Sequence, residues 1–154
     1  MTTADRVTAF LEQIGDPSQL AASEFLGLQF DAGLAWVHFP HGSGGHDATP
    51  NEQQVVDEML SAAGCPSPRQ DIAHLMIAPT IAVHGSTEQR ARWLRPLFTG
   101  GEIWCQLFSE PGAGSDLAGL AMRAERDGDR WLVTGEKVWS TFAHLSSWAM
   151  VLVR

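Results

Sequence analysis

The chain has 154 residues, of which 44 % are hydrophobic, and its formal net charge is −8 from 10 Lys and Arg against 18 Asp and Glu. This length accommodates one ordinary domain, or a small domain and part of a second, with enough apolar residues for a folded core. The acidic balance excludes nucleic acid and anionic membrane surfaces as expected partners, because both would be repelled.

The N-terminal residues lead directly into an amphipathic pattern and lack the apolar segment and cleavage site of a secretory signal. The longest apolar run, Trp148 to Val153, is far shorter than the ~20 residues that a membrane-spanning helix requires. We therefore expect a cytoplasmic protein without a membrane span. Its two cysteines, Cys65 and Cys105, are then reduced structural thiols.

Helical periodicity dominates the first hundred residues. One helix face is marked by the apolar residues Val7, Phe10, Leu11 and Ile14. The turn signal Gly15-Asp16-Pro17 then ends that pattern, and a less regular apolar stretch from Leu20 to Leu28 favours a second helix. Residues 36–45, with three glycines and one proline, predict a loop.

Three further helix starts are marked by a capping box, at residues 49–52, 67–70 and 86–89. In this pattern a hydroxyl accepts from the amide three residues on, while Glu or Gln bonds back to the amide of the cap. Gly64 and Gly85 lie where helices often end in a left-handed residue. Pro79 lies inside the helix expected over 72–83 and predicts a kink, because proline removes one backbone hydrogen bond.

From Trp104 the periodicity becomes strand-like, so the sequence predicts a helical domain over 1–103 and a β domain over 104–154. Segments 120–126, 130–134 and 147–154 predict strands of an antiparallel meander, with turn residues between them. So few strands cannot close a barrel or bury both faces of a sheet. We therefore interpret the second domain as truncated.

The densest chemical signal is the stretch 104–116, in which an expected strand runs into the turn Pro111-Gly112-Ala113-Gly114-Ser115. Glycines at 112 and 114 permit positive φ and a close approach of the backbone to a ligand, as in loops that cradle phosphates and flat rings. On its own, such a segment is better interpreted as a simple tight turn.

Together with its neighbours, this stretch resembles the signature of the acyl-CoA dehydrogenase family. Residues 135–141, Gly-Glu-Lys-Val-Trp-Ser-Thr, resemble the second flavin-contacting segment of that family, and residues 85–104 resemble its linker between helical and β domains. The similarity runs from about Phe30 to the end of the chain. It implies an α+β fold, in which an all-α N-terminal domain is followed by the truncated start of an antiparallel β-barrel domain.

The resemblance also implies an FAD cofactor and assigns the residues that contact it. Gln106 to Ser109 are expected along the isoalloxazine edge, and Trp139 over a ring face, with Thr141 near the reactive flavin nitrogen. Gly114 and Ser115 are expected beside the pyrophosphate and the pantetheine of an acyl-CoA. The implied cofactor-binding set is Gln106, Leu107, Phe108, Ser109, Gly114, Ser115, Trp139, Ser140 and Thr141, with Ser115 also contacting the substrate. A flavin requires such donors and an apolar wall that excludes water.

Three departures from the family pattern bear on the substrate. Ser140 stands where a branched apolar residue is common, and Phe142-Ala143 replaces a frequent Asn-Gly. The loop 41–46, His-Gly-Ser-Gly-Gly-His, differs from the acidic-aromatic-Gly-Gly stretch that borders the acyl cavity of the family. The identity of the acyl group therefore stays open.

The resemblance implies α,β-dehydrogenation of an acyl-CoA thioester, in which a carboxylate takes the α-proton and the flavin accepts hydride. The family usually supplies that carboxylate from a C-terminal helical domain absent from this sequence, and Glu102 and Glu110 favour structural roles. We thus expect an oxidoreductase of fatty acid or lipid catabolism that has no catalytic residue of its own and is inactive alone. An electron-transfer flavoprotein or similar acceptor, and a homo- or hetero-oligomer, are also implied.

Other functions stay open to different degrees. A non-catalytic subunit that pairs with a full-length flavoprotein homologue is the main alternative, and a flavin monooxygenase or acyl-CoA oxidase is a third. A metal site at His38, His41, His46 and Asp47 lacks a fixed ligand spacing. A hydrolase built on Ser115 and Asp116 lacks the Gly-x-Ser-x-Gly elbow, and the six tryptophans favour core or interface positions over a stacking surface.

Overall fold

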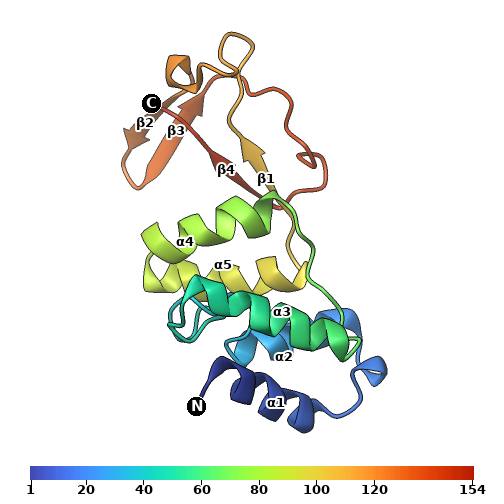
Figure 1. Cartoon of the computed structure of the whole chain (residues 1–154). Coiled ribbons are helices and arrows are strands. Elements are labelled where there is room, and N and C mark those ends of the chain that lie inside the picture. Colours follow the sequence, from blue (N-terminus) through green and yellow to red (C-terminus); the bar gives the residue numbers. More distant parts are fainter. The chain divides into compact units, whose positions relative to one another are not determined.

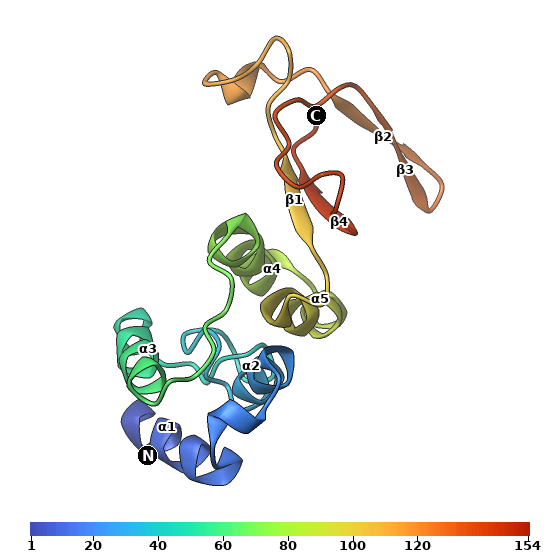
Figure 2. The same ribbon diagram turned by 90° about the vertical axis from the view of Figure 1, so that its right-hand side faces the viewer.

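The computed structural model describes residues 1–154, which form two compact units. The helical unit comprises Met1–Glu102 and the β unit comprises Ile103–Arg154. Figures 1 and 2 show the helices of the first and the strands of the second from two directions. None of the helices combines the length and the apolar character that crossing a bilayer demands.

The helical unit contains five α-helices, with a long loop between the second and the third. They are α1 (Thr3–Ile14), α2 (Ala22–Asp31), α3 (Gln53–Ala62), α4 (Ala78–His84) and α5 (Thr87–Thr99), with a π-helical turn at Ala73–Ile77 and 3₁₀ turns at Pro17–Gln19 and Pro50–Glu52. The two helices expected near residues 7–14 and 20–28 are confirmed as α1 and α2. Both keep their expected apolar faces inside, because Val7, Phe10 and Phe25 are buried.

Two of the three expected capping boxes form, at Thr49 and at Ser86. The box expected over 67–70 is wrong, since residues 65–70 have no regular structure and the helix begins at Ile72. Asp71 caps that helix instead, and its carboxylate accepts from the amides of Ala73 at 3.0 Å and His74 at 3.4 Å. A carboxylate makes stronger hydrogen bonds to the unpaired amides of a helix start than a hydroxyl does. The cap therefore lies at Asp71, four residues after Ser67.

The irregularity expected from Pro79 takes the form of the π-helical turn directly before it. The amide of Ala78 bonds to the carbonyl of Ala73, five residues back, so Pro79 lies in the first turn of α4, where its missing amide is tolerated. Gly64 has the expected positive φ of 71°. The same expectation for Gly85 is wrong, because its φ is −73°. Glycine is needed there for space, since a Cβ would lie 2.5 Å from the carbonyl oxygen of Ile81.

The predicted loop after α2 is confirmed, and it is part of the core. The carbonyl of Gly44 accepts from the amides of Ala35 and Trp36, and the carbonyl of Val37 accepts from His46 and Ala48. Trp36 packs on Phe98 of α5 with ring centroids 5.0 Å apart. The largest fully buried side chains of the helical unit are Phe25, Phe98, Leu34, Ile77, Leu94, Leu97, Val7, Val37 and Val56.

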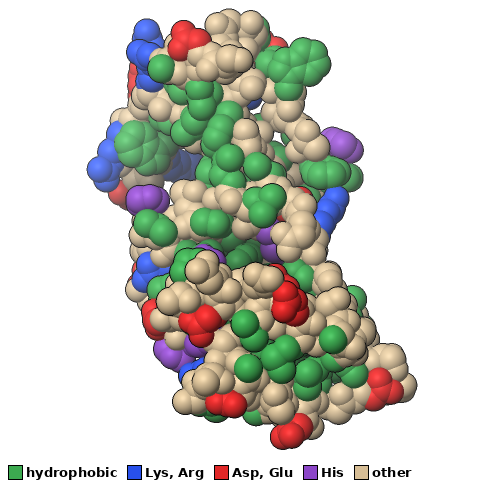
Figure 3. All heavy atoms as spheres, viewed as in Figure 1, with side chains coloured by type: hydrophobic (Ala, Val, Ile, Leu, Met, Phe, Trp, Pro, Cys, Tyr) green, Lys and Arg blue, Asp and Glu red, His purple; other side chains and the backbone are tan.

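The β unit contains four short strands in two separate two-stranded sheets. The strands are β1 (Trp104–Leu107), β2 (Arg123–Asp127), β3 (Arg130–Thr134) and β4 (Trp148–Val151). The hairpin β2–β3 is antiparallel as expected, with Gly128 at φ +60° in its turn. It leaves Trp131, Leu132 and Val133 exposed, and Figure 3 shows hydrophobic side chains on the surface of this unit.

The expected meander is wrong, because β4 does not continue the hairpin but pairs in parallel with β1. Residues 135–147 return the chain to the start of β1, where the amide of Ser147 bonds to the carbonyl of Ile103. The rings of Trp104 and Trp148, opposite each other in the register, then stack 5.7 Å apart. These residues do not form a barrel, although a helical N-terminal region followed by the start of a sheet is present.

Candidate functional site

The structure brings the two motif-bearing stretches of the β unit side by side. We call residues 106–116 the first segment and residues 135–141 the second segment. The amide of Val138 donates to the carbonyl of Ser109 at 2.9 Å, and the ammonium of Lys137 donates to the carbonyl of Phe108 at 2.9 Å. Segments that are about thirty residues apart in sequence therefore adjoin in the fold.

A buried ion pair holds these segments together. The Lys137 ammonium lies 2.8 Å from Oε1 of Glu110, and the two side chains are 3 % and 8 % exposed. The Glu110 carboxylate also accepts from the amides of Ala121 at 2.6 Å and Met122 at 2.9 Å. Hydrogen bonding from Lys137, followed by that from Ala121, lowers the pKa of Glu110 to about 2. Glu110 therefore joins three stretches of chain, and its carboxyl group is ionised at neutral pH.

Sequence reasoning recognised the second segment but missed the role of its lysine. Lys137 is the only lysine in the chain, and the other members of its 10 Lys and Arg residues are arginines. A single flexible ammonium in the middle of a motif is a signal that could have been followed. Its partner could not be identified from spacing, because Glu110 lies 27 residues earlier.

The Gly-rich turn is tight and open on its outer side. Glu110 and Ala113 exchange backbone hydrogen bonds of 2.9 and 3.1 Å, and Ala113 is buried. Neither Gly112 nor Gly114 uses the positive φ that glycine permits. A Cβ on either glycine would meet no atom within 4 Å. Packing within the chain therefore does not require glycine at these two positions.

The second segment presents its aromatic residue outward in an unfavourable backbone conformation. Trp139 is 90 % exposed at φ +60°, and Phe142 follows at φ +63°. Bulky residues seldom adopt positive φ, and such strain concentrates at functional positions. Between them, Ser140 has a buried hydroxyl oxygen without a hydrogen-bond partner, and Thr141 is exposed. An exposed indole and an unpaired hydroxyl leave this surface able to receive a flat, polar-edged ligand.

The strand that carries the first segment is fixed by its neighbour. Gln106 lies opposite Met150 and Leu107 opposite Val151 in the parallel pair, and the carbonyl of Leu107 accepts from the amide of Leu152. Gln106, Leu107, Phe108 and Ser109 are all half-buried, whereas Gly114 and Ser115 are exposed. All nine residues expected to contact the flavin thus lie within the β unit.

The histidine-rich loop of the helical unit has a structural arrangement. His46 bonds through Nδ1 to the carbonyl of Gly33 at 2.8 Å and through Nε2 to the hydroxyl of Thr3 at 3.2 Å. His38 packs edge-on against Phe39, and burial lowers its pKa. No group of three or more His, Cys, Asp or Glu side chains gathers at a point where it could hold a metal ion.

Comparison with known families accounts for nearly the whole chain. Residues 4–101 match the sequence model of the acyl-CoA dehydrogenase N-terminal domain, and residues 105–154 match that of the acyl-CoA dehydrogenase middle domain. Among curated relatives, acyl-CoA dehydrogenase FadE34 of Mycobacterium tuberculosis is 45 % identical over 124 residues, which are 80 % of this chain and 17 % of that protein. Acyl-CoA dehydrogenase IpdE1 of the same organism is 39 % identical over 123 residues, 80 % of this chain and 32 % of that protein.

Solved structures show the same relationship. The ChsE4–ChsE5 complex of Mycobacterium tuberculosis contains a chain that superposes with a TM-score of 0.62 at 26 % identity, over 99 % of this chain and 41 % of that one. A glutaryl-CoA dehydrogenase from Mycobacterium smegmatis in complex with FADH2 gives a TM-score of 0.58 at 26 % identity, over 99 % of this chain and 41 % of that one. This chain spans less than half the length of the relatives that it matches.

Proposed function

Because this chain belongs to the acyl-CoA dehydrogenase family, we propose that it forms the flavin-contacting front part of an FAD-dependent acyl-CoA dehydrogenase. The reaction is the α,β-dehydrogenation of an acyl-CoA thioester. The observation that carries the proposal is the direct contact between the first and second segments, made by the Val138 amide on Ser109 and by Lys137 on Phe108. A flat ring that must touch both segments can do so only if they adjoin.

Each segment has a distinct role in this proposal. Gln106 to Ser109 line one edge of the ring with backbone groups and the Ser109 hydroxyl, and Gly114 and Ser115 lie beside phosphate and pantetheine groups. Trp139 covers a ring face and excludes water, while Ser140 and Thr141 offer hydroxyls near the redox-active edge. The residues present fit a flavin, since the turn is open at Gly112 and Gly114 and the Ser140 hydroxyl lacks a partner. FAD, when bound, supplies the hydride acceptor.

The carboxylate that takes the α-proton lies outside this chain in the proposal. Glu110 is a poor base, because its carboxylate is paired with Lys137 and its pKa is about 2. Glu102 is occupied by Arg92, with Nη2 and Oε1 2.6 Å apart. Full activity therefore requires further polypeptide, from the same protein or from a partner, and electrons then pass to an electron-transfer flavoprotein or a similar acceptor.

A second candidate is an interaction subunit without its own catalysis, which pairs with a full-length homologue into a hetero-oligomer. The β2–β3 hairpin supports it, because Trp131 and Leu132 are 64 % and 61 % exposed. Exposed apolar residues of this size on a soluble domain often mark an interface.

Visible spectroscopy of the purified chain separates the two candidates. Bound flavin in near-equimolar amount, lost in the variant Trp139→Ala and retained in the control Trp131→Ala, supports the flavin-contacting role. A colourless chain that captures a full-length flavoprotein homologue, and releases it when Trp131 is replaced by Ala, supports the interaction subunit instead.

A further inference from the structure

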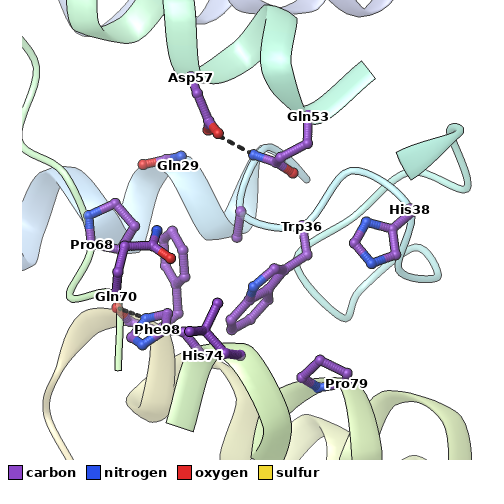
Figure 4. Close-up of a pocket in the computed structure, with 12 residues that line it drawn as sticks. Gln29, Trp36, His38, Gln53, Asp57, Pro68, Gln70, His74, Pro79 and Phe98 are labelled. Carbon is purple, nitrogen blue, oxygen red and sulfur yellow. Dashed lines mark hydrogen bonds between the residues drawn. The ribbon is translucent and has the colours of Figure 1, made fainter. Parts of the chain in front are cut away.

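Two adjoining hollows open in the helical unit between α3 and the segment 66–79. The first, the aromatic hollow, has a volume of about 280 Å³ and is drawn in Figure 4, where Gln53 and Asp57 reach in from α3 and His74 and Pro79 from the opposite helix. The second, of about 310 Å³, continues along α3 toward Leu60. Gln29, Asp57, Pro68 and Gln70 line both hollows, so the two are neighbours that share a wall.

Buried aromatic rings line one side of the aromatic hollow. Trp36 and Phe98 meet edge to face with ring centroids 5.0 Å apart, and Phe39 stacks on Trp36 at 5.0 Å. Phe98 is 1 % exposed and Trp36 is 9 % exposed, so both rings are buried by neighbouring side chains. Planar walls of this kind bind a ring through its faces and edges.

One polar atom in the wall has no partner. Gln29 is only 2 % exposed, and its side-chain Nε2 donates to the carbonyl of Leu34 at 2.9 Å. That bond sets the orientation of the amide, and Oε1 then lacks any hydrogen bond. A buried carbonyl oxygen without a donor is unfavourable. A ligand that donates a hydrogen bond to it in the hollow therefore gains more binding free energy than the same bond gives in water.

The surroundings of this oxygen select the kind of donor. The Asp57 carboxylate, which accepts from Nε2 of Gln53 at 3.0 Å, lies in the wall shared by the hollows and disfavours an anionic ligand. Oε1 is enclosed by its neighbours, so a ligand reaches it only when a lining side chain moves, and Gln70 is one of the exposed lining side chains.

We propose that the hollows form a binding site for a ring system that carries a hydroxyl group. The ring packs on Trp36 and Phe98, and the hydroxyl donates to Oε1 of Gln29. Such a ring belongs to a free hydroxylated compound or to the acyl group of a thioester, and the latter source rests on the proposed function.

Calorimetric titration of the whole chain with phenol, anisole and toluene tests this chemistry, because these probes have similar size but only phenol donates. Phenol is expected to bind roughly tenfold more tightly than the other two, as one buried hydrogen bond requires. Gln29→Met removes that advantage, whereas Gln54→Met, on the exposed face of α3, retains it. Equal affinities for the three probes, or no binding of any, overturn the proposal.

A steric variant covers the case in which Gln29→Met does not fold. Gln70→Trp fills the shared part of the hollows from an exposed position, and it is expected to abolish phenol binding without lowering the melting temperature. Unchanged phenol affinity in that variant overturns the site. Comparison of 4-ethylphenol with 4-hydroxyphenylacetyl-CoA separates the two sources of the ring. Tighter binding of the thioester assigns the site to an acyl group. Tighter or equal binding of 4-ethylphenol assigns the site to a free compound.

The readout is independent of the flavin. The indole resonance of Trp36 in an NMR spectrum reports on the aromatic hollow, within the helical unit. A colourless chain whose Trp36 resonance shifts with phenol contradicts the proposed function alone. A yellow chain whose resonance does not shift contradicts only the ring site.

Discussion

The ammonium of Lys137 lies 2.8 Å from the carboxylate of Glu110, with both side chains nearly excluded from solvent. This ion pair joins the Gly-rich turn to the segment that presents Trp139, and the same carboxylate bonds the amides that precede β2. A buried pair of this kind adds little net stability compared with apolar packing, but the loss of one partner is strongly destabilising. Its main effect is therefore to determine which stretches of the β unit adjoin.

Lys137→Met is expected to separate the first and second segments, because it leaves the Glu110 carboxylate buried without its cation. The amide of Val138, which bonds to Ser109, then exchanges with solvent at least roughly tenfold faster. Arg130→Met, which removes an exposed cation from β3, serves as the matched control and leaves this rate unchanged. Protection of the Val138 amide in Lys137→Met equal to that of the parent chain would contradict the positioning role.

The β unit is expected to lose stability in acid through Glu110. The pKa of this carboxyl is about 2 in the folded chain against an ordinary value of 4.5, so the ionised form favours folding. The contribution is complete above about pH 4.5 and disappears as the pH falls to about 2. Hydrogen exchange of β-unit amides across this range measures it, and Glu110→Gln is expected to flatten the profile. A slope that persists in Glu110→Gln assigns the acid sensitivity to another group.

The helical unit has its own acid-sensitive group, which serves as an internal comparison. Hydrogen bonding, first from the Thr3 hydroxyl and then from Thr49, lowers the pKa of Glu52 to about 2. The contribution of Glu52 to stability is also lost as the pH falls from about 4.5 to about 2. Hydrogen exchange of the α1 amides measures it. Glu52→Gln is expected to flatten the profile of α1 and to leave that of the β unit unchanged.

Phe98→Ala is expected to destabilise the helical unit by about 3–5 kcal/mol, because it removes a side chain that is 1 % exposed and leaves a cavity beside Trp36 and Phe30. Urea unfolding followed by circular dichroism measures the loss. Val83→Ala, at a position 71 % exposed on α4, is expected to stay within about 0.5 kcal/mol of the parent. Similar losses in both variants would show that Phe98 is not part of the core.

The helix cap at Asp71 predicts a contrast between two neighbouring substitutions. Asp71→Ala removes the acceptor for the amides of Ala73 and His74 and is expected to cost about 1 kcal/mol. Ser67→Ala, at the position where the sequence pattern places a cap, is expected to be nearly neutral. A larger loss of stability in Ser67→Ala than in Asp71→Ala, measured by urea unfolding, would place the cap at Ser67.

Trp139→Gly is expected to raise stability and to weaken flavin binding together. The positive φ of Trp139 strains a bulky residue by about 1 kcal/mol, and glycine adopts it freely. Because Trp139 is 90 % exposed, little packing is lost. Thermal unfolding measures the first effect and flavin titration the second. Undiminished flavin affinity would remove Trp139 from the site.

The sequence alone determined the local features whose causes lie within a few residues. Helix faces such as that of Val7 and Phe10, the caps at Thr49 and Ser86, and the hairpin turn at Gly128 follow from periodicity and backbone preference, which act over one or two turns. The family resemblance of residues 104–116 and 135–141 was visible for the same reason, since a motif is a local pattern.

Only the tertiary structure decided which distant pieces meet. The parallel pairing of β4 with β1, the cap at Asp71 in place of Ser67, and the contact of Lys137 with Glu110 each depend on groups that compete for partners across the fold. Pairing strands in parallel or in a meander satisfies the same alternating pattern, and the path of residues 135–147 selects between them. Burial makes that selection strict, because a charge or a backbone amide removed from water must find its partner wherever the chain has placed one.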